Sequence, residues 1–360
     1  MDEFAADTGL SGGAPARRYL WTDAFAVCNF LGLHRITGEK RHLDRALLLV
    51  DQVHHVLGRH RADDARQGWL SGLDGEEAEA HPTRGGLRIG KPAPERGADE
   101  RFDARREWDR DGQYLHYLTQ WMHALHRLAE DTGVQHFNAW AIELAQAAHA
   151  AFSRGGGLAG SGGYAWKMSV DLRRALVATS GQHDAVDALV SFLELDAGGR
   201  SLVRETEAAR RMAGAAILAT DDALGIGSLL LDACRLARLG ERAARADGEL
   251  TLNLLSAAMS GLEAFVVGRE LEAPAGSRLA FRELGLAIGL HALEHAAGAG
   301  FDIRCRAVLA EAQDRMPLAY LVDAFWMSPA NRRAASWTSH QDINSVMLAT
   351  SLLPSGYLGR

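Results

Sequence analysis

Lysine, cysteine and long apolar runs are scarce in this sequence. These shortages and the charge balance argue against several classes of protein. Of the 39 basic side chains only three are lysines (Lys40, Lys91 and Lys167), and the 46 acidic side chains leave a net charge of −7. A charge of this sign argues against a nucleic-acid-binding protein. The three cysteines stand far apart with no Cys-x-x-Cys pair. We therefore expect buried thiols rather than a disulfide framework or a cysteine zinc site.

A membrane span and a secretory signal are also unexpected. The apolar stretch 284–293 is too short and too rich in glycine and alanine to cross a bilayer. The first twenty residues place Asp2, Glu3 and Asp7 before any basic residue and contain no apolar run. The sequence therefore predicts a cytoplasmic protein with no membrane partner.

Apolar residues at helical spacing are abundant, whereas the alternation typical of strands is nearly absent. This pattern predicts an all-α fold. We expect eleven long helices at about 18–36, 40–58, 112–131, 134–153, 183–195, 202–217, 221–239, 248–267, 278–297, 302–315 and 339–353. Short polar turns at 37–39 and 131–133 predict that neighbouring helices form antiparallel hairpins.

Two irregular segments interrupt the helices. Residues 62–110 carry glycine, proline, arginine and glutamate in place of periodic apolar positions, and a loop of this length in a compact domain is commonly functional. Because it also contains Trp69 and Trp108, we expect an ordered lid. The glycine-rich stretch 155–163 is a weak reason to divide the chain there. We predict a single domain over residues 1–360.

Six of the expected helices begin alike, with an acidic residue just before an unusually apolar stretch. These acids are Asp23, Asp109 with Asp111, Asp184, Asp222, Glu283 and Asp342. Six apolar helices alternating with more amphipathic ones are what an (α/α)6 toroid requires. Its inner helices run parallel, so the acids would gather at the mouth of one cavity. The alternative is plain N-capping, because aspartate at a helix start accepts hydrogen bonds from free backbone N–H groups.

In helix number and helix starts the sequence resembles the six-hairpin glycosidase-like superfamily. These toroids include glycoside hydrolases, polysaccharide lyases and the N-acylglucosamine 2-epimerase group. The resemblance covers most of the chain as topology. It implies an (α/α)6 toroid that binds a sugar at the N-termini of the inner helices, while the residue roles below are inferred from the sequence itself.

The segment 107–114, Glu-Trp-Asp-Arg-Asp-Gly-Gln-Tyr, carries the strongest signal for chemistry. Glycoside hydrolysis needs one protonated and one ionised carboxyl group. We expect Asp109 or Asp111 as the acid and Asp23 as the base or nucleophile. The alternative is a charged loop end that Trp108 anchors by packing.

Tryptophans near helix starts and in loops predict a sugar-binding surface, because an indole ring stacks on the apolar face of a sugar. Two polar side chains near these helix starts are expected to contact the same ligand. The predicted substrate contacts are Trp21, Trp108, Trp166, Trp337, Gln113 and Asp342.

Glycine-flanked cations in the loop predict a place for an anionic group. Arg88 and Lys91, within Arg-Gly-Gly-Leu-Arg-Ile-Gly-Lys, are suited to a uronate carboxylate or a sugar phosphate. Ion pairs with nearby acids are the alternative.

Two histidines at helix starts favour a different reaction. His183 precedes Asp184, and His340 lies two residues before Asp342. If both face the cavity, one imidazole removes a proton next to a carbonyl and the other returns it on the opposite face, as in a sugar 2-epimerase or isomerase. The alternative is packing or capping at a helix end.

A third motif belongs to another class of enzyme. His291-Ala-Leu-Glu294-His295 matches the pattern of inverted zinc peptidases, but it lies late in an alanine- and glycine-rich helix without a third ligand at suitable spacing. We therefore expect no metal.

Taken together, these patterns predict a cofactor-independent, carbohydrate-active enzyme with a small saccharide or glycoconjugate as substrate. Glycoside hydrolysis is the first hypothesis and epimerisation the second. The third is a sugar-binding or scaffold protein without catalysis.

Overall fold

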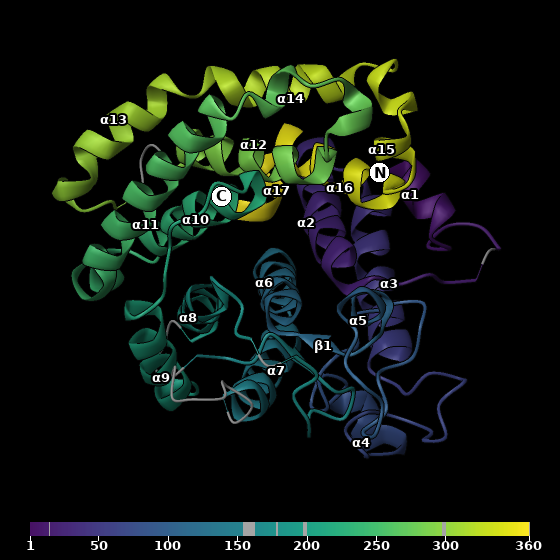
Figure 1. The fold of residues 1–360 in the computed structure, drawn as a ribbon. Helices are drawn as coiled ribbons and strands as arrows, with labels where there is room; N and C mark the ends of the chain where they lie inside the picture. Colours follow the sequence, from purple (N-terminus) through teal and green to yellow (C-terminus); the bar gives the residue numbers. More distant parts are fainter. Residues whose placement is uncertain (14, 154–162, 178, 197–199, 297–299, 360) are drawn as a thin grey trace. The chain divides into compact units, whose positions relative to one another are not determined.

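The computed structural model describes residues 1–13, 15–153, 163–177, 179–196, 200–296 and 300–359. Over this part of the chain the regular structure is almost entirely helical (Figure 1). Its strands, β1 (Gln113–Tyr114) and β2 (Lys167–Met168), have two residues each and pair antiparallel. The predicted all-α class is therefore confirmed.

The eleven long helices expected from periodicity are all present, with ends displaced by at most seven residues. They are α2 (Leu20–Thr37), α3 (Lys40–Leu57), α6 (Leu115–Thr132), α7 (His136–Phe152), α8 (Asp184–Leu195), α9 (Val203–Gly214), α10 (Ala223–Arg238), α11 (Glu241–Val267), α12 (Ala280–His295), α13 (Arg306–Asp314) and α16 (Gln341–Leu352). The turns after α2 and α6 end in Gly38 and Gly133, both left-handed, which is the usual way to stop a helix.

One long helix, α14 (Pro317–Met327), is absent from the sequence prediction. It begins with proline and carries one charged residue, Asp323, so no polar face alternates with an apolar one. Five further helices are too short for a helical period to be recognised. They are α1 (Asp2–Asp7), α4 (Gly75–Ala80), α5 (Ala104–Asp109), α15 (Ala335–Thr338) and α17 (Pro354–Leu358).

The described chain divides into two compact units, Asp2–Ala216 and Ile217–Arg360. Helical hairpins make up both: α2 packs on α3, α6 on α7 and α8 on α9 in the first unit, and α10 packs on α11 in the second. A single domain over residues 1–360 stays a prediction.

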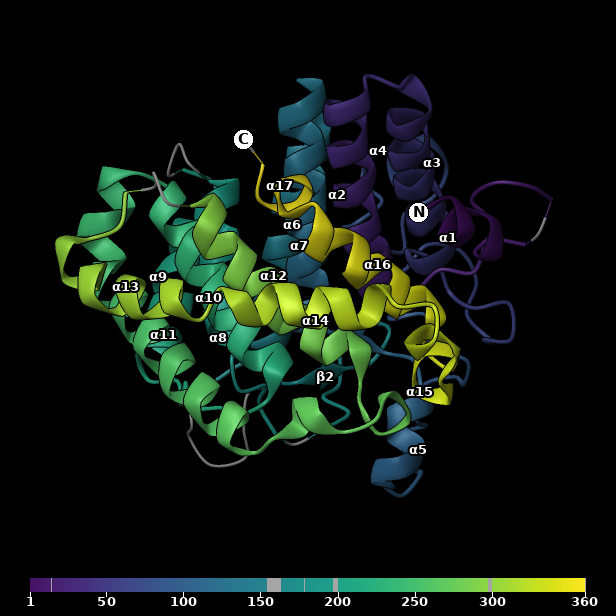
Figure 2. The same cartoon turned by 90° about the horizontal axis from the view of Figure 1, so that it is seen from above.

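In the first unit α2, α6 and α8 lie side by side in sequence order (Figures 1 and 2). Helix α2 has the pattern of an inner helix, since every residue from Leu20 to Gly32 is buried. The three helices begin at the same end: Tyr19, before α2, is hydrogen-bonded to Tyr117 in the first turn of α6, and His116 lies beside Asp184, the first residue of α8.

In the second unit α10, α12 and α16 also begin together. Asp222 at the start of α10 forms an ion pair with Arg282 at the start of α12. The ring of Phe281 in α12 lies 5.8 Å from that of His340, which precedes α16. The helices predicted to be inner therefore occur as two sets of three, and within each set the starts lie close together.

Helices α10 and α12 approach so closely that glycine is required at their crossing. A Cβ atom at Gly227 would overlap the backbone carbonyl of Gly285, and one at Gly289 would lie 2.5 Å from the carbonyl oxygen of Gly227. The two backbones thus contact each other directly, and the neighbouring Leu286 and Leu290 are fully buried.

Replacing Gly227 by alanine is expected to destabilise the protein by about 1 to 3 kcal/mol, because the added methyl group must push two buried helices apart. Gly214→Ala is the matched control, since a Cβ atom at this helical position meets nothing within 4 Å, and alanine there favours the helix. Urea unfolding of both variants measures the difference. Equal midpoints would show that the crossing is not tightly packed.

The irregular region 62–110 belongs to the first unit and packs on it. Leu87 and Ile89 are fully buried, and the backbone N–H of Ile89 donates to the carbonyl of Gly112 (2.9 Å). This packing agrees with the prediction of an ordered loop, whereas its action as a lid stays a prediction. Apart from Gly163, the glycine-rich stretch 155–163 lies outside the described residues.

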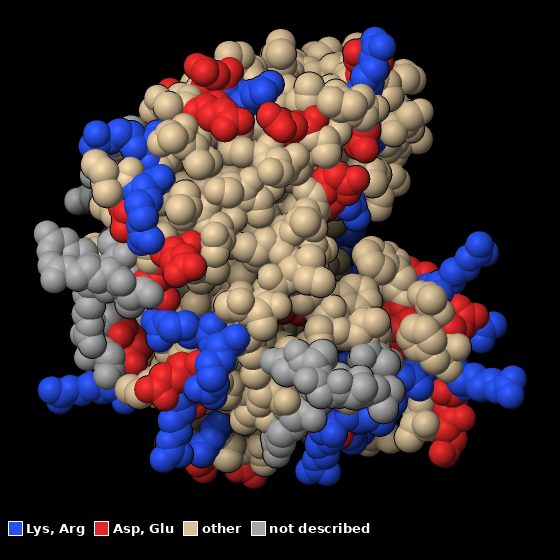
Figure 3. Space-filling model, turned by 60° about the vertical axis from the view of Figure 1, so that its left-hand side comes forward, with Lys and Arg blue, Asp and Glu red and all other residues tan. Residues whose placement is uncertain are grey.

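Cys28, Cys234 and Cys305 are buried free thiols, as expected. The part of the chain that the structure describes contains one helical stretch long and apolar enough to span a membrane, Asp247–Val267, of which 44% is buried; a single such helix is weak evidence for a span. On the face in Figure 3, basic side chains lie beside acidic ones.

Candidate functional site

The carboxylate predicted to act as base or nucleophile, Asp23, is held in place by its neighbours. It lies in the first turn of α2 and is 1% exposed. Its side chain accepts a hydrogen bond from the backbone N–H of Tyr19 (2.9 Å) and pairs with the guanidinium of Arg18 (3.4 Å). These contacts are those of a helix-capping carboxylate, the alternative weighed from the sequence.

The predicted acid Asp111 is fully buried inside the loop. Its oxygens accept hydrogen bonds from the Arg88 guanidinium and from the backbone N–H groups of Gly90 and Gly112 (both 3.1 Å). Arg88 in turn donates to the carbonyl oxygens of Val56 (2.6 Å) and Arg59 (2.7 Å). Arg88 and Asp111 thus fix the loop to the end of α3, and the expected anion contact at Arg88 is already occupied.

Two further predicted substrate contacts also lie in the interior. Gln113 is fully buried, accepts a hydrogen bond from the backbone N–H of Leu87 (2.8 Å) and donates to the carbonyl of Val170 (2.8 Å). Trp337 is 4% exposed and stacks on Trp326, with ring centroids 5.7 Å apart. Both side chains occupy core positions, and their predicted contact with a substrate stays a prediction.

Asp109 does not begin a long helix, as the pattern predicted, but ends the short helix α5. The pattern failed here because a two-residue strand and a loop turn separate Asp109 from the start of α6 at Leu115. Asp109 is exposed, and so is the neighbouring Trp108 at 57%. The Lys91 ammonium lies 4.9 Å from the Trp108 ring centroid. Asp109, Trp108 and Lys91 therefore share an open edge of the loop.

The two predicted catalytic histidines are in different units. His183 directly precedes α8 in the first unit, while the exposed His340 precedes α16 in the second, with Asp342 in the following turn. A joint role for His183 and His340 stays a prediction.

A cluster of aromatic side chains gathers where α2 and α6 begin. The aromatic cluster consists of Tyr19, Trp21, Tyr114, Tyr117 and Trp166. The Tyr117 centroid lies 5.5 Å from that of Tyr19, 6.5 Å from Trp21 and 5.2 Å from Tyr114, and Trp166 lies 5.0 Å from Tyr114. The β1–β2 pairing sets Tyr114 opposite Lys167, the residue after Trp166. The predicted Trp21 and Trp166 are thus brought together with three tyrosines.

Next to this cluster, His116 and Asp184 form a pair without full hydrogen bonding. His116 Nδ1 lies 3.7 Å from Asp184 Oδ1, and the His116 ring contacts Tyr117 (4.7 Å) and Tyr114 (5.3 Å). His116 Nδ1 and Asp184 Oδ2 have no hydrogen-bond partner among the described residues. The Asp184 side chain is 7% exposed and that of His116 is 28% exposed. The carboxyl group of Asp184 and the Nδ1 atom of His116 are therefore buried, while the rest of the His116 side chain is partly exposed.

Burial shifts the ionisation of both members of this pair. It raises the pKa of Asp184 to about 7 and lowers the pKa of His116 to about 4. Near neutral pH the imidazole is therefore uncharged, and the carboxyl group exists in both protonation states. A carboxyl group with a pKa near 7 is suited to accept and return protons.

Two lysines approach the aromatic cluster with different surroundings. Lys167 is fully buried, and its ammonium donates to the carbonyl of Glu107 (2.8 Å) and pairs with the Glu107 carboxylate (2.9 Å). The half-buried Lys91 ammonium lies over the rings of Tyr19 (5.5 Å) and Trp108 (4.9 Å). Burial lowers the pKa of Lys91. The ammonium group of Lys167 is thus bound by Glu107 of the loop, whereas that of Lys91 contacts aromatic faces.

The zinc-peptidase motif does not converge on one point. His291 Nε2 lies 2.8 Å from Asp323 Oδ2, while His295 Nε2 donates to the carbonyl of Gly359 (3.2 Å). His291 Nδ1 and Glu294 are 3.8 Å apart. Among the residues described, no three His, Cys, Asp or Glu side chains are grouped so as to hold a metal ion.

Sequence reasoning missed His116 and the tyrosines of the cluster. Tyr114-Leu-His116-Tyr117 stands at the very start of a predicted helix, and four ring residues including Trp121 occur within eight positions. Rings this dense at a helix start, where capping residues are usual, were the available signal. The sequence marks Asp184 only as a helix-start acid and as the neighbour of His183.

Comparison with known proteins supports the fold and leaves the activity open. No protein-family model matches the chain, and no curated protein matches it in sequence. A solved structure, that of a sugar epimerase from a ruminal bacterium, covers 93% of this chain and 87% of its own length, with a TM-score of 0.51 and 10% identity. At this identity the likeness shows the fold alone, and it is consistent with the predicted α/α toroid.

Proposed function

We propose that the protein is a carbohydrate-processing enzyme that epimerises or isomerises a sugar at the helix starts of α2, α6 and α8. The observation that carries the proposal is the His116–Asp184 pair, whose carboxyl group has a pKa of about 7 beside the aromatic cluster. The likeness in fold to a sugar epimerase agrees with this reaction. Epimerisation was the second hypothesis from the sequence.

The proposed chemistry is proton transfer next to a carbonyl group. Ionised Asp184 removes the proton from the adjacent carbon; the C–H electron pair forms a carbon–carbon double bond, and the carbonyl oxygen becomes an enolate. Return of a proton to the other face of this carbon gives the epimer. His116 contacts both Asp184 and the aromatic cluster. Its neutral imidazole is therefore placed to hydrogen-bond the sugar or pass on the proton.

The aromatic cluster provides the surface on which a sugar would stack. Tyrosine and tryptophan rings offer apolar faces, while their polar groups bind hydroxyls. Because Arg88 is occupied by Asp111, Lys91 is the cation that remains for a carboxylate or phosphate on the substrate. His183, adjacent to Asp184, remains the sequence-based candidate for a second proton-transfer group.

Glycoside hydrolysis, the first hypothesis from the sequence, has weaker support. Asp23 and Asp111 are each buried against a guanidinium group and accept backbone hydrogen bonds. Their oxygens are therefore engaged inside the protein, and of the three predicted carboxylates only Asp109 is exposed.

Proton NMR in D2O tests the proposal directly. The purified protein is incubated with neutral sugars, amino sugars, uronates and sugar phosphates. For one of these classes we expect the signal of the proton next to the carbonyl to disappear as deuterium enters and the epimer accumulates. Release of reducing ends from glycosides without such exchange would instead establish a hydrolase. Binding detected by thermal shift without either reaction would indicate a sugar-binding protein.

A further inference from the structure

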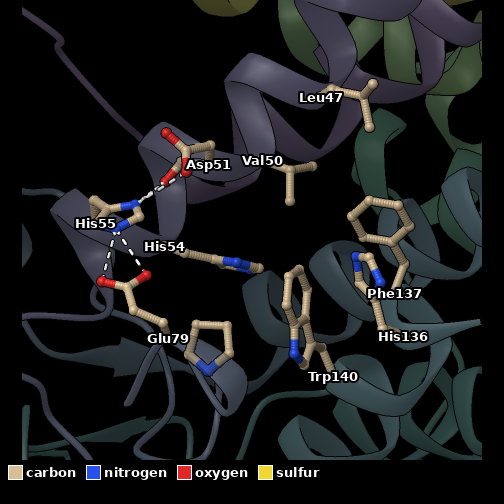
Figure 4. A pocket seen from close by; sticks show the side chains of 10 residues that line it. Leu47, Val50, Asp51, His54, His55, Glu79, His136, Phe137 and Trp140 are labelled. Atoms are coloured by element: carbon tan, nitrogen blue, oxygen red, sulfur yellow. Dashed lines mark hydrogen bonds and ion pairs between the residues drawn. The ribbon is translucent and has the colours of Figure 1, made fainter. Parts of the chain in front are cut away.

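A cavity in the first unit is lined by residues outside the aromatic cluster. It measures about 220 Å³ and opens between α3, α7 and the segment at α4 (Figure 4). None of its residues belongs to the aromatic cluster or to the His116–Asp184 pair. It is lined by Leu47, Val50, Asp51, His54, His55, Glu79, Pro82, His136, Phe137 and Trp140.

One wall of this cavity consists of rings set at steep angles to one another. The centroid of Trp140 lies 5.5 Å from that of Phe137 and 5.1 Å from that of His54, with interplanar angles of 81° in both pairs. The His136 ring lies 4.6 Å from Trp140. Rings turned in this way surround a small volume with π faces and edges. Val50 and Leu47 add aliphatic surface from α3.

The ring of His54 is uncharged. Burial lowers its pKa to about 3, and its Nε2 accepts a hydrogen bond from the indole N–H of Trp121 (3.2 Å). His54 therefore adds an aromatic surface and no positive charge to the cavity.

The opposite side of the cavity is acidic. His55 Nε2 lies 3.0 Å from a Glu79 carboxylate oxygen, and His55 Nδ1 lies 3.3 Å from one of Asp51 (Figure 4). Both acids remain more than half exposed, Asp51 at 62% and Glu79 at 55%. Burial opposes protonation of His55, but hydrogen bonds to Asp51 and Glu79 raise its pKa overall, so its imidazole offsets part of the negative charge. Neither lysine nor arginine is among the lining residues, and two carboxylates against one imidazole favour a cation over an anion.

From the ring wall and the acidic side together, we infer that this cavity binds a small organic cation of the alkylammonium class. Aromatic faces attract quaternary ammonium groups through their π electrons, and aliphatic surface accommodates their methyl groups. Asp51 and Glu79 add an electrostatic attraction at the mouth. The site is independent of the sugar reaction and makes no use of the catalytic pair.

Choline and its uncharged isostere 3,3-dimethylbutan-1-ol provide the test, because they share a shape and differ in charge. We expect isothermal titration calorimetry with the whole protein to show binding of choline and at least tenfold weaker binding of the isostere. Glu79→Gln should weaken choline binding about 2- to 5-fold, the usual contribution of an exposed charge. Glu77→Gln, on the same short helix but outside the cavity, is the matched control and should leave it unchanged.

Three results would overturn the inference. They are no choline binding at millimolar concentration, equal binding of choline and the isostere, or equal effects of Glu79→Gln and Glu77→Gln. Because Glu79 is exposed, its replacement is not expected to unfold the protein. A fluorescence or circular-dichroism spectrum unchanged from that of the wild type confirms this for each variant.

Discussion

Asp184→Asn is expected to lower the rate of proton exchange on the sugar by about 100- to 10,000-fold, the usual contribution of a general base. The amide keeps the size of the carboxyl group and cannot accept the proton. The rate is measured by deuterium incorporation, with circular dichroism as the check on folding. Asp302→Asn is the control, since Asp302 stands at the start of a helical turn in the second unit, outside the proposed site. An unchanged rate for Asp184→Asn would exclude Asp184 as the base.

The pH dependence gives this prediction a second readout. In the wild type, activity should rise as pH increases through about 7, because Asp184 then ionises. Stability should change in the opposite direction. The folded-state pKa is raised above the ordinary value of 3.8, so the folded protein binds more protons than the unfolded chain between about pH 4 and 7. The free energy of unfolding therefore falls across this window in the wild type. Asp184→Asn should remove that part of the slope.

Helical periodicity predicted the long helices well because it depends on burial along one face. The hairpins followed from short turns such as Thr37-Gly38-Glu39, in which a left-handed glycine ends the helix. Periodicity did not predict helix α14, because apolar residues lie on most of its sides. Inner helices show a different signal, apolar residues on all faces, and α2 is accordingly buried from Leu20 to Gly32.

The site was harder to predict, because an aspartate at a helix start can either cap the helix or act in catalysis. Asp23 and Asp184 look alike in sequence, yet Asp23 meets the guanidinium of Arg18 and Asp184 meets a neutral imidazole. His116, on another helix, supplies that imidazole, and its position follows from the packing of α6 on α8. No local pattern shows which acid acquires a cation and which is left in an apolar setting. That difference decides the pKa and hence the chemistry.

A role for Asp111 in stability predicts that Asp111→Asn lowers the free energy of unfolding by about 3 to 5 kcal/mol, because the Arg88 guanidinium is left buried without its anionic partner. Chemical denaturation measures the loss. Asp109→Asn is the control, since this neighbouring carboxylate is exposed and its replacement should change stability by less than about 0.5 kcal/mol.

The double variant Arg88→Met/Asp111→Leu separates the two roles proposed for Asp111. If the residue stabilises the loop by pairing with Arg88, the double variant should lose less stability than the sum of Arg88→Met and Asp111→Leu, since neither charge is then left alone. It should also retain sugar turnover wherever it folds. If Asp111 is instead the acid of a glycosidase, Asp111→Asn keeps the stability of the wild type and loses hydrolysis. Stability and turnover measured on the same variants therefore distinguish a loop anchor from a catalytic acid.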